Sequence, residues 1–597
     1  MAYTSPPALP RELWGYIESH LSNADIKSLR LACKQFNNAV FLRLNRVFLS
    51  ANPLNIEVFR NIASHDTFRH QINEIIWDEA RLSRGPARTD ETNEGHELLS
   101  DEDEPDNDRE WVAGYHTQYR EVITGRHESE EDESEEDESE EDESEEDEFE
   151  EDESEEDDGP GCPRWFEKVC GLNFYVLESR ERRDVDGPGR IARWEQVFDQ
   201  PSLKEPWQHY LRLLRQQKDV LACQTDLEAF AFGVKRFPAL KRVTITPAAH
   251  GNLTTPLYPT PMIRAFPKGF NYPIPRGWLY PRANLEPATP YTWNQYPELR
   301  DRYRGFRTAM RVLANAPNSV SELVMTSNSI PTGINCTIFD EPCEEYNHFA
   351  TVLKKPGFRR LDIALLLGGR REEDREVCWR SLLNGRLRLA LGEAKETEEF
   401  RLHASFDIMT FDVGFYPDGK PPPLQSIVPV EQWSKLRHFE LAGFAISQGD
   451  CVSFLKTLPK SVRSIELSML EFFGGGWYSM LEEIKRMVSE STLWGDRDAG
   501  SRPKITIGVP LADTSPTYGH GIWIEKEVED FIYGEGENPF RKHSRNSIQS
   551  GVGVMRDALE PDFEHPYHDY MSNGGYFETD EYLQERYPNE GCIGARF

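Results

Sequence analysis

One short pattern recurs along this chain and restricts its fold more than any other feature. An apolar residue is followed by two others, a second apolar residue, one more residue and a third apolar residue. Alternate residues of a strand point to the same face, so the last two apolar positions predict a strand with one buried face. Six full copies occur, at Ile72/Ile75/Trp77, Leu240/Val243/Ile245, Val320/Leu323/Met325, Phe358/Leu361/Ile363, Leu436/Phe439/Leu441 and Val462/Ile465/Leu467. Two weaker copies keep only the last two positions, Phe400/Leu402 and Ile505/Ile507.

The spacing of these copies predicts a repeat architecture of the α/β class. From residue 320 onward the first positions fall at 320, 358, 397, 436, 462 and 502, so the intervals are 38, 39, 39, 26 and 40 residues. Helical patterns lie between the copies, such as the faces Phe306/Met310/Leu313 and Leu481/Ile484/Val488 and the segment EEYNHFATVLKKP. Strand, helix and strand at regular intervals predict right-handed crossovers stacked into a solenoid of the leucine-rich-repeat type. These repeats exceed the usual length of roughly 20–29 residues, so we expect long helices and an irregular arc.

Residues 83–158 predict a long disordered acidic insertion. The part 128–158 holds 25 Asp and Glu and no Lys or Arg, and it repeats ESEED with a period of five. Like charge at this density opposes collapse, and a period of five matches neither a helix nor a strand. Taking these 25 charges from the net charge of −35 leaves −10 on the other 566 residues. The chain therefore has no general basic surplus, and we expect no nucleic-acid partner.

The acidic run has two interpretations. It is either a ligand for basic proteins or a solvated spacer, and the sequence leaves both open. Five of its serines precede Glu-Glu-Asp, the pattern favoured by acidophilic kinases of the casein-kinase-II type, so we predict phosphorylation at Ser129, Ser134, Ser139, Ser144 and Ser154. Each phosphate would add about −1.5 to −2 charges, which changes binding more than folding.

Motifs of cofactor, metal and catalytic sites are missing from the sequence. None of the nine cysteines forms a close C-x-x-C pair, and their odd number suits a reducing compartment. The pair in HPYH, His565 and His568, is too little for a metal site. No phosphate-binding loop, Gly-x-Ser-x-Gly elbow or His-Glu-x-x-His motif occurs. We therefore expect a protein that is not an enzyme and that needs no cofactor and no metal.

Targeting and membrane segments are not predicted either. No apolar run approaches the roughly 20 residues of a membrane helix, and the N-terminus has no signal-peptide core. We expect a cytoplasmic and/or nuclear protein with no membrane partner.

The stretch LPRELWGYIESHLSNADIKSLRLACKQFNNAV, residues 9–40, predicts three short helices. Pro10 falls where a first helical turn tolerates proline, and SNAD at 22–25 offers capping side chains for the second helix. The apolar residues form three groups, Leu13, Ile17 and Leu21, then Ile26 and Leu29, then Cys33 and Phe36. So small a unit buries little surface alone, so we expect its apolar face to need a partner.

This stretch resembles an F-box. The residues that fit the pattern of that family are Leu9, Pro10, Glu12, Leu13, Ile17, Leu21, Asp25, Ile26, Leu29, Cys33, Lys34 and Phe36. The resemblance implies that the helices pack against the Skp-type adaptor of an SCF ubiquitin ligase, which also contains a cullin, and that the downstream domain holds a protein substrate of unknown identity. The adaptor-binding residues that it implies are Leu9, Pro10, Leu13, Ile17, Leu21, Ile26, Leu29, Cys33 and Phe36. Packing within the three helices is their alternative role, and we expect both.

The whole chain also resembles fungal leucine-rich-repeat F-box proteins, in which FPKGFNYPIPRGW and EDFIYGEGENPF have counterparts. The resemblance implies a substrate-recognition subunit that performs no bond chemistry but raises the concentration of a substrate lysine near a charged ubiquitin-conjugating enzyme. Two alternatives stay open: a scaffold that recruits no substrate, and an acidic chaperone-like binder of basic proteins.

The predicted organisation places an F-box at 1–50 and the start of the repeat domain at 51–82. The insertion at 83–158 follows, then the repeat domain at 159–510 with an ordered Pro/aromatic loop at 247–297, and an acidic aromatic tail at 511–597. Because the Ile72 copy precedes the insertion, we expect QINEIIWD to form the first strand of the repeat domain. The acidic run would then be a loop excursion from that domain.

Arginines gather around one pair of repeats, at Arg359, Arg360, Arg370, Arg371, Arg380, Arg386 and Arg388. They predict either a positive patch for an acidic substrate or ion pairs with the neighbouring residues Glu372, Glu373, Asp374 and Glu376, and the ion pairs are the favoured interpretation.

Overall fold

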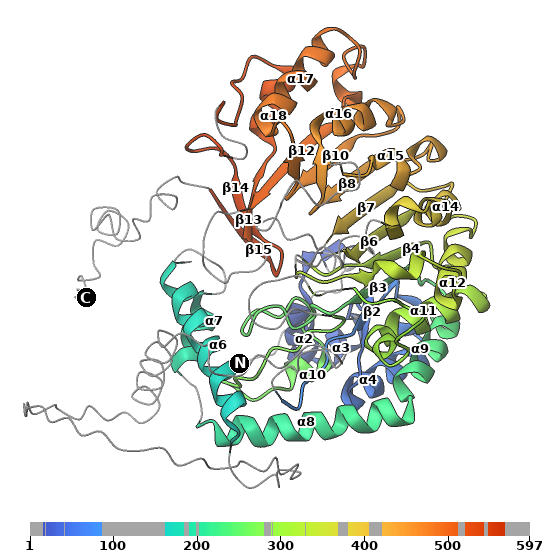
Figure 1. The fold of residues 1–597 in the computed structure, drawn as a ribbon. Coiled ribbons are helices and arrows are strands. Elements are labelled where there is room, and N and C mark those ends of the chain that lie inside the picture. The colour runs from blue at the N-terminus through green and yellow to red at the C-terminus, as the bar shows by residue number, and fades with distance from the viewer. Residues whose placement is uncertain are drawn as a thin grey trace, which may run out of the picture.

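One large sheet, curved into an arc and lined by helices on its outer side, organises the molecule (Figure 1). The computed structural model describes residues 13, 16–17, 20–40, 42–85, 162–183, 190–198, 202–279, 288, 290–328, 330–367, 380–404, 421–510, 520–542 and 547–566. In this part of the chain the fold is mixed α/β with a mostly parallel sheet of 13 strands, in agreement with the predicted α/β class.

The strands follow one another across the sheet in chain order. Nine parallel strands form the arc: β1 (Arg46–Leu49), β2 (Glu74–Asp78), β3 (Arg242–Thr246), β4 (Glu322–Met325), β6 (Arg360–Leu366), β7 (Glu399–Ala404), β8 (His438–Ala442), β10 (Ser464–Ser468) and β12 (Lys504–Pro510). Three antiparallel strands extend it: β13 (His520–Ile524), β14 (Val554–Asp557) and β15 (Glu560–Pro566). The short strand β5 (Ile334–Asn335) pairs with β6, and β9 (Ala445–Ser447) pairs with β11 (Glu471–Phe473) in a separate ribbon.

The recurring apolar pattern sets the register of the parallel strands. Val243 lies opposite Ile75 on one side and Leu323 on the other, and every later copy continues the same row to Ile505. The last apolar position forms a second row, from Trp77 to Ile507. Both rows are buried against the helices, because the strand period of two keeps them on one face. The eight predicted strands are confirmed.

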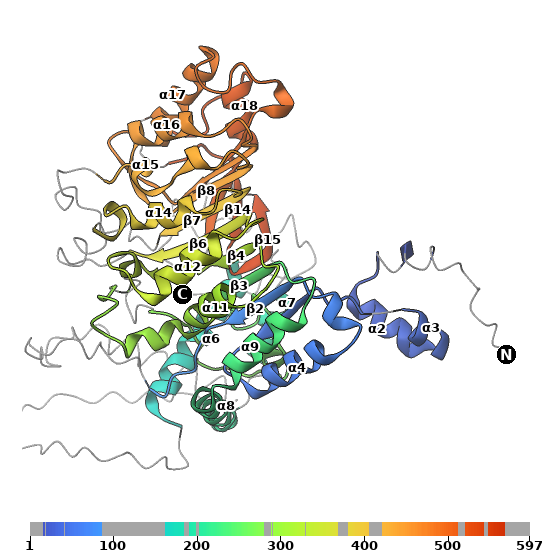
Figure 2. The same cartoon turned by 90° about the vertical axis from the view of Figure 1, so that its right-hand side faces the viewer.

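Helices cover the outer face of the arc (Figures 1 and 2). They are α4 (Pro53–Ser64), α9 (Thr225–Arg236), α11 (Arg304–Asn315), α12 (Glu344–Leu353), α14 (Arg386–Gly392), α15 (Leu424–Ile427), α16 (Gln448–Thr457), α17 (Trp477–Ser489) and α18 (Lys526–Tyr533). The three helical patterns between the copies correspond to α11, α12 and α17. In α11, Phe306, Met310 and Leu313 are fully buried, as the helical period requires. Short 3-10 turns lie at Phe68–His70, Leu299–Tyr303, Cys336–Phe339, Val430–Gln432 and Ala499–Ser501.

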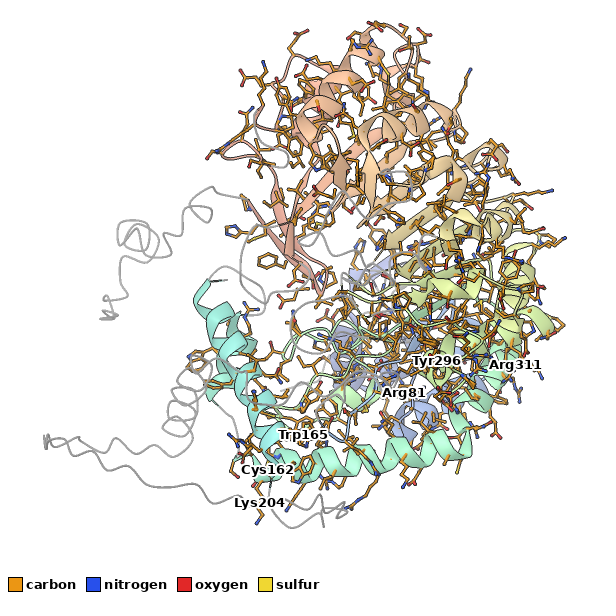
Figure 3. All side chains as sticks on the ribbon, viewed as in Figure 1. Arg81, Cys162, Trp165, Lys204, Tyr296 and Arg311 are labelled. Carbon is orange, nitrogen blue, oxygen red and sulfur yellow. The ribbon has the colours of Figure 1, made fainter. Side chains whose placement is uncertain are left out.

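Three further helices between β2 and β3 form a second core with the Pro/aromatic loop. They are α6 (Arg164–Arg183), α7 (Arg190–Phe198) and α8 (Lys204–Cys223). Phe166 and Cys170 of α6 pack with Trp207 and Tyr210 of α8, and Figure 3 shows Cys162, Trp165 and Lys204 where these helices meet. None of the described helices is both long enough and apolar enough to cross a membrane.

The Pro/aromatic loop is ordered over most of 247–297, as predicted, and includes the short helix α10 (Pro261–Arg264). It crosses the ends of the first strands. The indole Nε1 of Trp278 donates a hydrogen bond of 2.5 Å to Glu79 after β2, and that of Trp293 donates one of 3.0 Å to Glu345 of α12. The loop is therefore anchored by two indoles, one to the end of β2 and one to the first turn of α12.

Two predictions about the organisation are wrong. The Ile72 segment forms the second strand, because β1 pairs with β2 at the edge of the sheet. The F-box range 1–50 therefore includes the first strand of the sheet. The sheet also does not end at residue 510, because β13, β14 and β15 add to it by ladder hydrogen bonds and α18 packs beside them. Residues 86–161, which hold the acidic run, and the end of the tail from 567 lie outside the described residues.

The hairpin of β14 and β15 returns across the inside of the arc toward β3 and β4 (Figure 1). At its turn Leu559, which is 1% exposed, packs with Ala248 and Ile330 beyond the ends of those strands. Glu560 accepts a hydrogen bond of 2.8 Å from Thr255 and lies 3.5 Å from Arg193 of α7. The last strands thus connect the far end of the arc to its beginning.

Candidate functional site

The N-terminal helices form a small unit with its own cap and junction. In α2 (Asn23–Ala32), the hydroxyl of Ser22 accepts from the amide of Asp25 at 3.1 Å, and the Asp25 carboxylate accepts from the Ser22 amide at 2.9 Å. The Ser22 hydroxyl also donates to the Asp25 carboxylate at 2.6 Å, and this bond, together with that from the Ser22 amide, lowers the pKa of Asp25. Cys33 is extended, and α3 (Lys34–Ala39) begins directly after it. The predicted second and third helices are therefore present, with SNAD as the cap.

The first predicted helix is described only in part. Residues 13, 16, 17 and 20 are helical, while Leu9 and Pro10 lie outside the described residues. The rings of Tyr16 and His20 meet edge to face with centroids 4.8 Å apart, as neighbours at i and i+4 on a helix do.

Few contacts join this unit to the sheet. The Asn23 side chain exchanges two hydrogen bonds, of 2.8 and 3.0 Å, with the backbone of Arg43, and the Arg43 side chain also reaches the carbonyl of Leu21. Figure 2 shows α2 and α3 standing away from the body of the molecule on the N-terminal side. The unit therefore presents most of its surface freely.

That surface is apolar at several positions. Leu13 is 50% exposed, Ile17 38% and Leu31 88%. Of the other predicted adaptor-binding residues, Ile26 is fully buried, and four are half-buried: Leu21, Leu29, Cys33 and Phe36. The predicted set thus divides into exposed side chains and side chains that hold the unit together.

Two exposed side chains of this surface were missed by sequence reasoning. Leu31 and Tyr16, the latter 69% exposed, lie off the stripe with a spacing of four, so the apolar periodicity gave no reason to select them. Leu31 could have been identified from the sequence, because it is an apolar residue outside the apolar stripe of a short helix.

A second surface, which is polar, lies on the face of the sheet opposite to the outer helices; this is called the open face. One residue before the first buried row, another row reads Arg46, Glu74, Arg242, Glu322, Arg360, Glu399 and His438 across neighbouring strands. Opposite charges therefore face each other at almost every step: Arg242 lies 2.6 Å from Glu322, and Arg360 lies 3.2 Å from Glu399. Such cross-strand pairs favour this register.

A carboxylate and two imidazoles form the centre of the open face. Glu440 lies 2.9 Å from Arg401, 2.6 Å from His403 and 3.5 Å from His438. Burial alone would raise the pKa of Glu440, but the charge and hydrogen bond of His403, with those of His438 and Arg401, hold it well below its usual value. Burial opposes protonation of His403, yet the charge of Glu440 raises its pKa. The group is therefore a saturated ion-pair network.

Glu466 lies beside this network on β10 and accepts a hydrogen bond of 3.0 Å from the indole of Trp523. Burial and the charge of Glu440 raise its pKa. No group of three or more His, Cys, Asp and Glu residues suited to a metal ion occurs in the described ranges. The charged groups of the open face are thus paired with one another.

The arginines of the predicted patch are largely engaged in ion pairs. Arg359 pairs with Glu322 at 2.5 Å, Arg360 with Asp362 at 2.7 Å and Arg388 with Glu431 at 2.5 Å. Glu322 and Glu431 come from neighbouring repeats, whereas Asp362 lies on the same strand as Arg360. Arg370 and Arg371, and the acidic residues at 372–376 beside them, lie outside the described residues, as do all five predicted phosphorylation sites.

A buried polar group beneath the Pro/aromatic loop was not anticipated from the sequence. Asp78 at the end of β2 lies 3.8 Å from Nε2 of His250, whose Nδ1 is 2.9 Å from the hydroxyl of Tyr272. All three side chains are almost fully buried. They have no access to a ligand, which indicates a structural role.

Comparison with known proteins adds no relative: no protein-family model, no curated protein and no solved structure matches this chain.

Proposed function

We propose that the chain is an F-box substrate receptor of an SCF-type ubiquitin ligase. In this proposal the helices before residue 41 bind a Skp-type adaptor, which links the chain to a cullin. The sheet and its outer helices act as an irregular leucine-rich-repeat solenoid that holds a protein substrate. The chain itself performs no bond chemistry, and it would act in the cytoplasm, the nucleus or both.

The observation that carries the proposal is the exposed apolar surface on a small, weakly attached unit. Leu13, Tyr16, Ile17 and Leu31 are exposed on helices whose Asn23 bonds the backbone of Arg43, just before β1. Apolar side chains gathered on a unit of this size favour a protein partner, because burying them there gains free energy that the unit alone does not obtain.

The repeat domain supports the role of a rigid holder. From β4 to β12 the strands of the arc alternate with outer helices, and each strand pairs with its neighbours along the arc, as in solenoid proteins. The hairpin contact at Leu559 fixes the far end of the arc to its start. Rigidity is useful in such a receptor, because the distance between substrate and conjugating enzyme sets the effective concentration of the lysine.

The proposal is tested by adaptor binding. We expect the purified chain to bind a Skp-type adaptor, and a Leu13→Asp/Ile17→Asp variant to lose this binding by more than roughly a hundredfold, because a carboxylate buried in an apolar interface costs several kcal/mol. Isothermal titration calorimetry gives the dissociation constant.

A matched control uses two exposed leucines on the outer face, in the Leu383→Asp/Leu389→Asp variant. It carries the same change of charge, and we expect it to bind the adaptor as the wild type does. Absence of wild-type binding, or equal loss in both variants, would reject the F-box assignment.

A further inference from the structure

Basic side chains line the edge of the sheet at which the parallel strands begin. The residue before each strand joins the ladder through its carbonyl, so these residues stand side by side in the order Lys241, Ser321, Arg359, Glu398, Arg437 and Arg463. Four of the six are basic, and all four are exposed. Because neighbouring strands are about 4.8 Å apart, the line from Lys241 to Arg463 is roughly 24 Å long.

A second set of basic residues lies beside this line, where the outer helices end. Helix ends favour cations, so a few lysines are expected there. The set found is larger than the preference of helix ends for cations explains, and all of its side chains are exposed: Lys235, Arg236, Lys354, Lys395, Lys435, Lys456 and Lys460. Together with the four residues of the line, these seven form the basic rim.

The charges of the basic rim are only partly balanced. Lys354 pairs with Glu393 at 3.5 Å, Lys435 with Glu396 at 2.9 Å, and Arg437 lies 3.9 Å from Glu398. Arg359 shares Glu322 with Arg242. No carboxylate of the described residues lies within ion-pair distance of the others, which are Lys235, Arg236, Lys241, Lys395, Lys456, Lys460 and Arg463. The rim therefore keeps a surplus of positive charge on a protein whose net charge is −35.

A hollow of about 210 Å³ interrupts the rim between Lys241 and Arg359. Its wall includes the hydroxyl residues Ser319 and Ser321 and the backbone at Gly357. The rest of the wall is apolar, from Pro238 to Leu240, and Arg359 is already paired with Glu322. Lys241 and the two serine hydroxyls at this opening suit a carboxylate, which accepts ion pairs and hydrogen bonds from these groups.

We propose that the basic rim binds an extended acidic peptide segment of another protein, with one carboxylate in the hollow beside Lys241. A line of 24 Å accommodates about seven residues of an extended chain. An acidic peptide is favoured over a nucleic acid, because the strongly negative protein would repel a long polyanion beyond the rim. That the bound peptide belongs to a ubiquitination substrate rests on the proposed function; the binding itself does not.

The test is fluorescence anisotropy with the full chain and a labelled peptide of twelve residues that alternates Glu and Gly. We expect binding that weakens as salt is raised, and none to a matched peptide of Gln and Gly. The Lys241→Glu/Arg437→Glu variant should bind the acidic peptide roughly tenfold or more weakly, because two attractions become repulsions. An Arg215→Glu/Lys218→Glu variant on α8, with the same change of charge, should bind as the wild type does.

Equal binding of the two peptides, or equal weakening in the two variants, would overturn the proposal. Tighter binding of a single-stranded oligonucleotide of the same charge would overturn the assignment to an acidic peptide. Adaptor binding is measured on the same samples and should be unchanged. If the wild-type chain binds the adaptor but not the acidic peptide, only the rim is contradicted, whereas binding of the peptide without the adaptor contradicts only the proposed function.

Discussion

Asp78 and His250 face each other inside the protein in states opposite to those they adopt in water. Burial raises the pKa of Asp78 to about 7 from an ordinary value of 3.8. Burial, with the charge of Arg276, lowers the pKa of His250 to about 3 from 6.5. Between about pH 4 and 6.5 the folded pair therefore carries its proton on Asp78, while the unfolded chain carries it on His250. Both states bind one proton, so the pair adds little pH dependence to stability in this range.

Separating the two groups should reveal opposite pH dependences. In Asp78→Asn the unfolded state alone binds a proton, at the histidine, so stability should rise as pH increases from about 3 to 6.5, by up to about 1.4 kcal/mol per pH unit. In His250→Gln the folded state alone binds a proton, at the carboxyl, so stability should fall as pH increases from about 4 to 7. Thermal unfolding followed across this range gives both slopes. Two variants that keep the wild-type profile would show that these ionisations are not perturbed as described.

The strands were the elements that the sequence predicted best, because alternate residues of a strand share one face and those on the buried face are apolar. The same spacing occurs at Leu44, Val47 and Leu49, and the last two residues lie in β1. The predicted F-box range 1–50 nevertheless includes this stretch. The strands β13, β14 and β15 were missed for a physical reason. They pair antiparallel and include Gly521 and several charged residues, so no repeat spacing marks them. In the site, periodicity found Leu13 and Ile17 but not Leu31.

The hairpin of β14 and β15 depends on a few contacts at its turn. In Leu559→Ala the packing against Ala248 and Ile330 is lost, and a large-to-small change at a buried leucine costs about 2–5 kcal/mol. We expect hydrogen exchange of β14 and β15 to become faster by a corresponding factor, while β6 to β10 keep their protection.

Leu389→Ala on α14 is the control for this change, because Leu389 is 68% exposed and its truncation should alter stability by about 0.5 kcal/mol or less. If the hairpin of the Leu559 variant exchanged as slowly as that of the wild type, its turn would not be held by these contacts.

On the scale of the whole molecule, two units differ in how they bury apolar surface. The sheet and its helices share one continuous core from Val47 to Ile548, whereas the N-terminal helical unit keeps Ile26 inside and leaves Leu13, Ile17 and Leu31 outside. Leu9 and Pro10, also expected at the adaptor, lie outside the described residues, so their proposed role rests on the resemblance to an F-box alone. This difference supports the proposal that the small N-terminal unit binds the adaptor and that the arc holds the substrate.

Hydrogen exchange of the full chain with and without a saturating Skp-type adaptor tests this division most directly. The account predicts slower exchange at residues 13–39, where the exposed apolar side chains lie, and unchanged exchange in the strands from β3 to β12. Unchanged exchange at 13–39, or protection in the sheet instead, would contradict it.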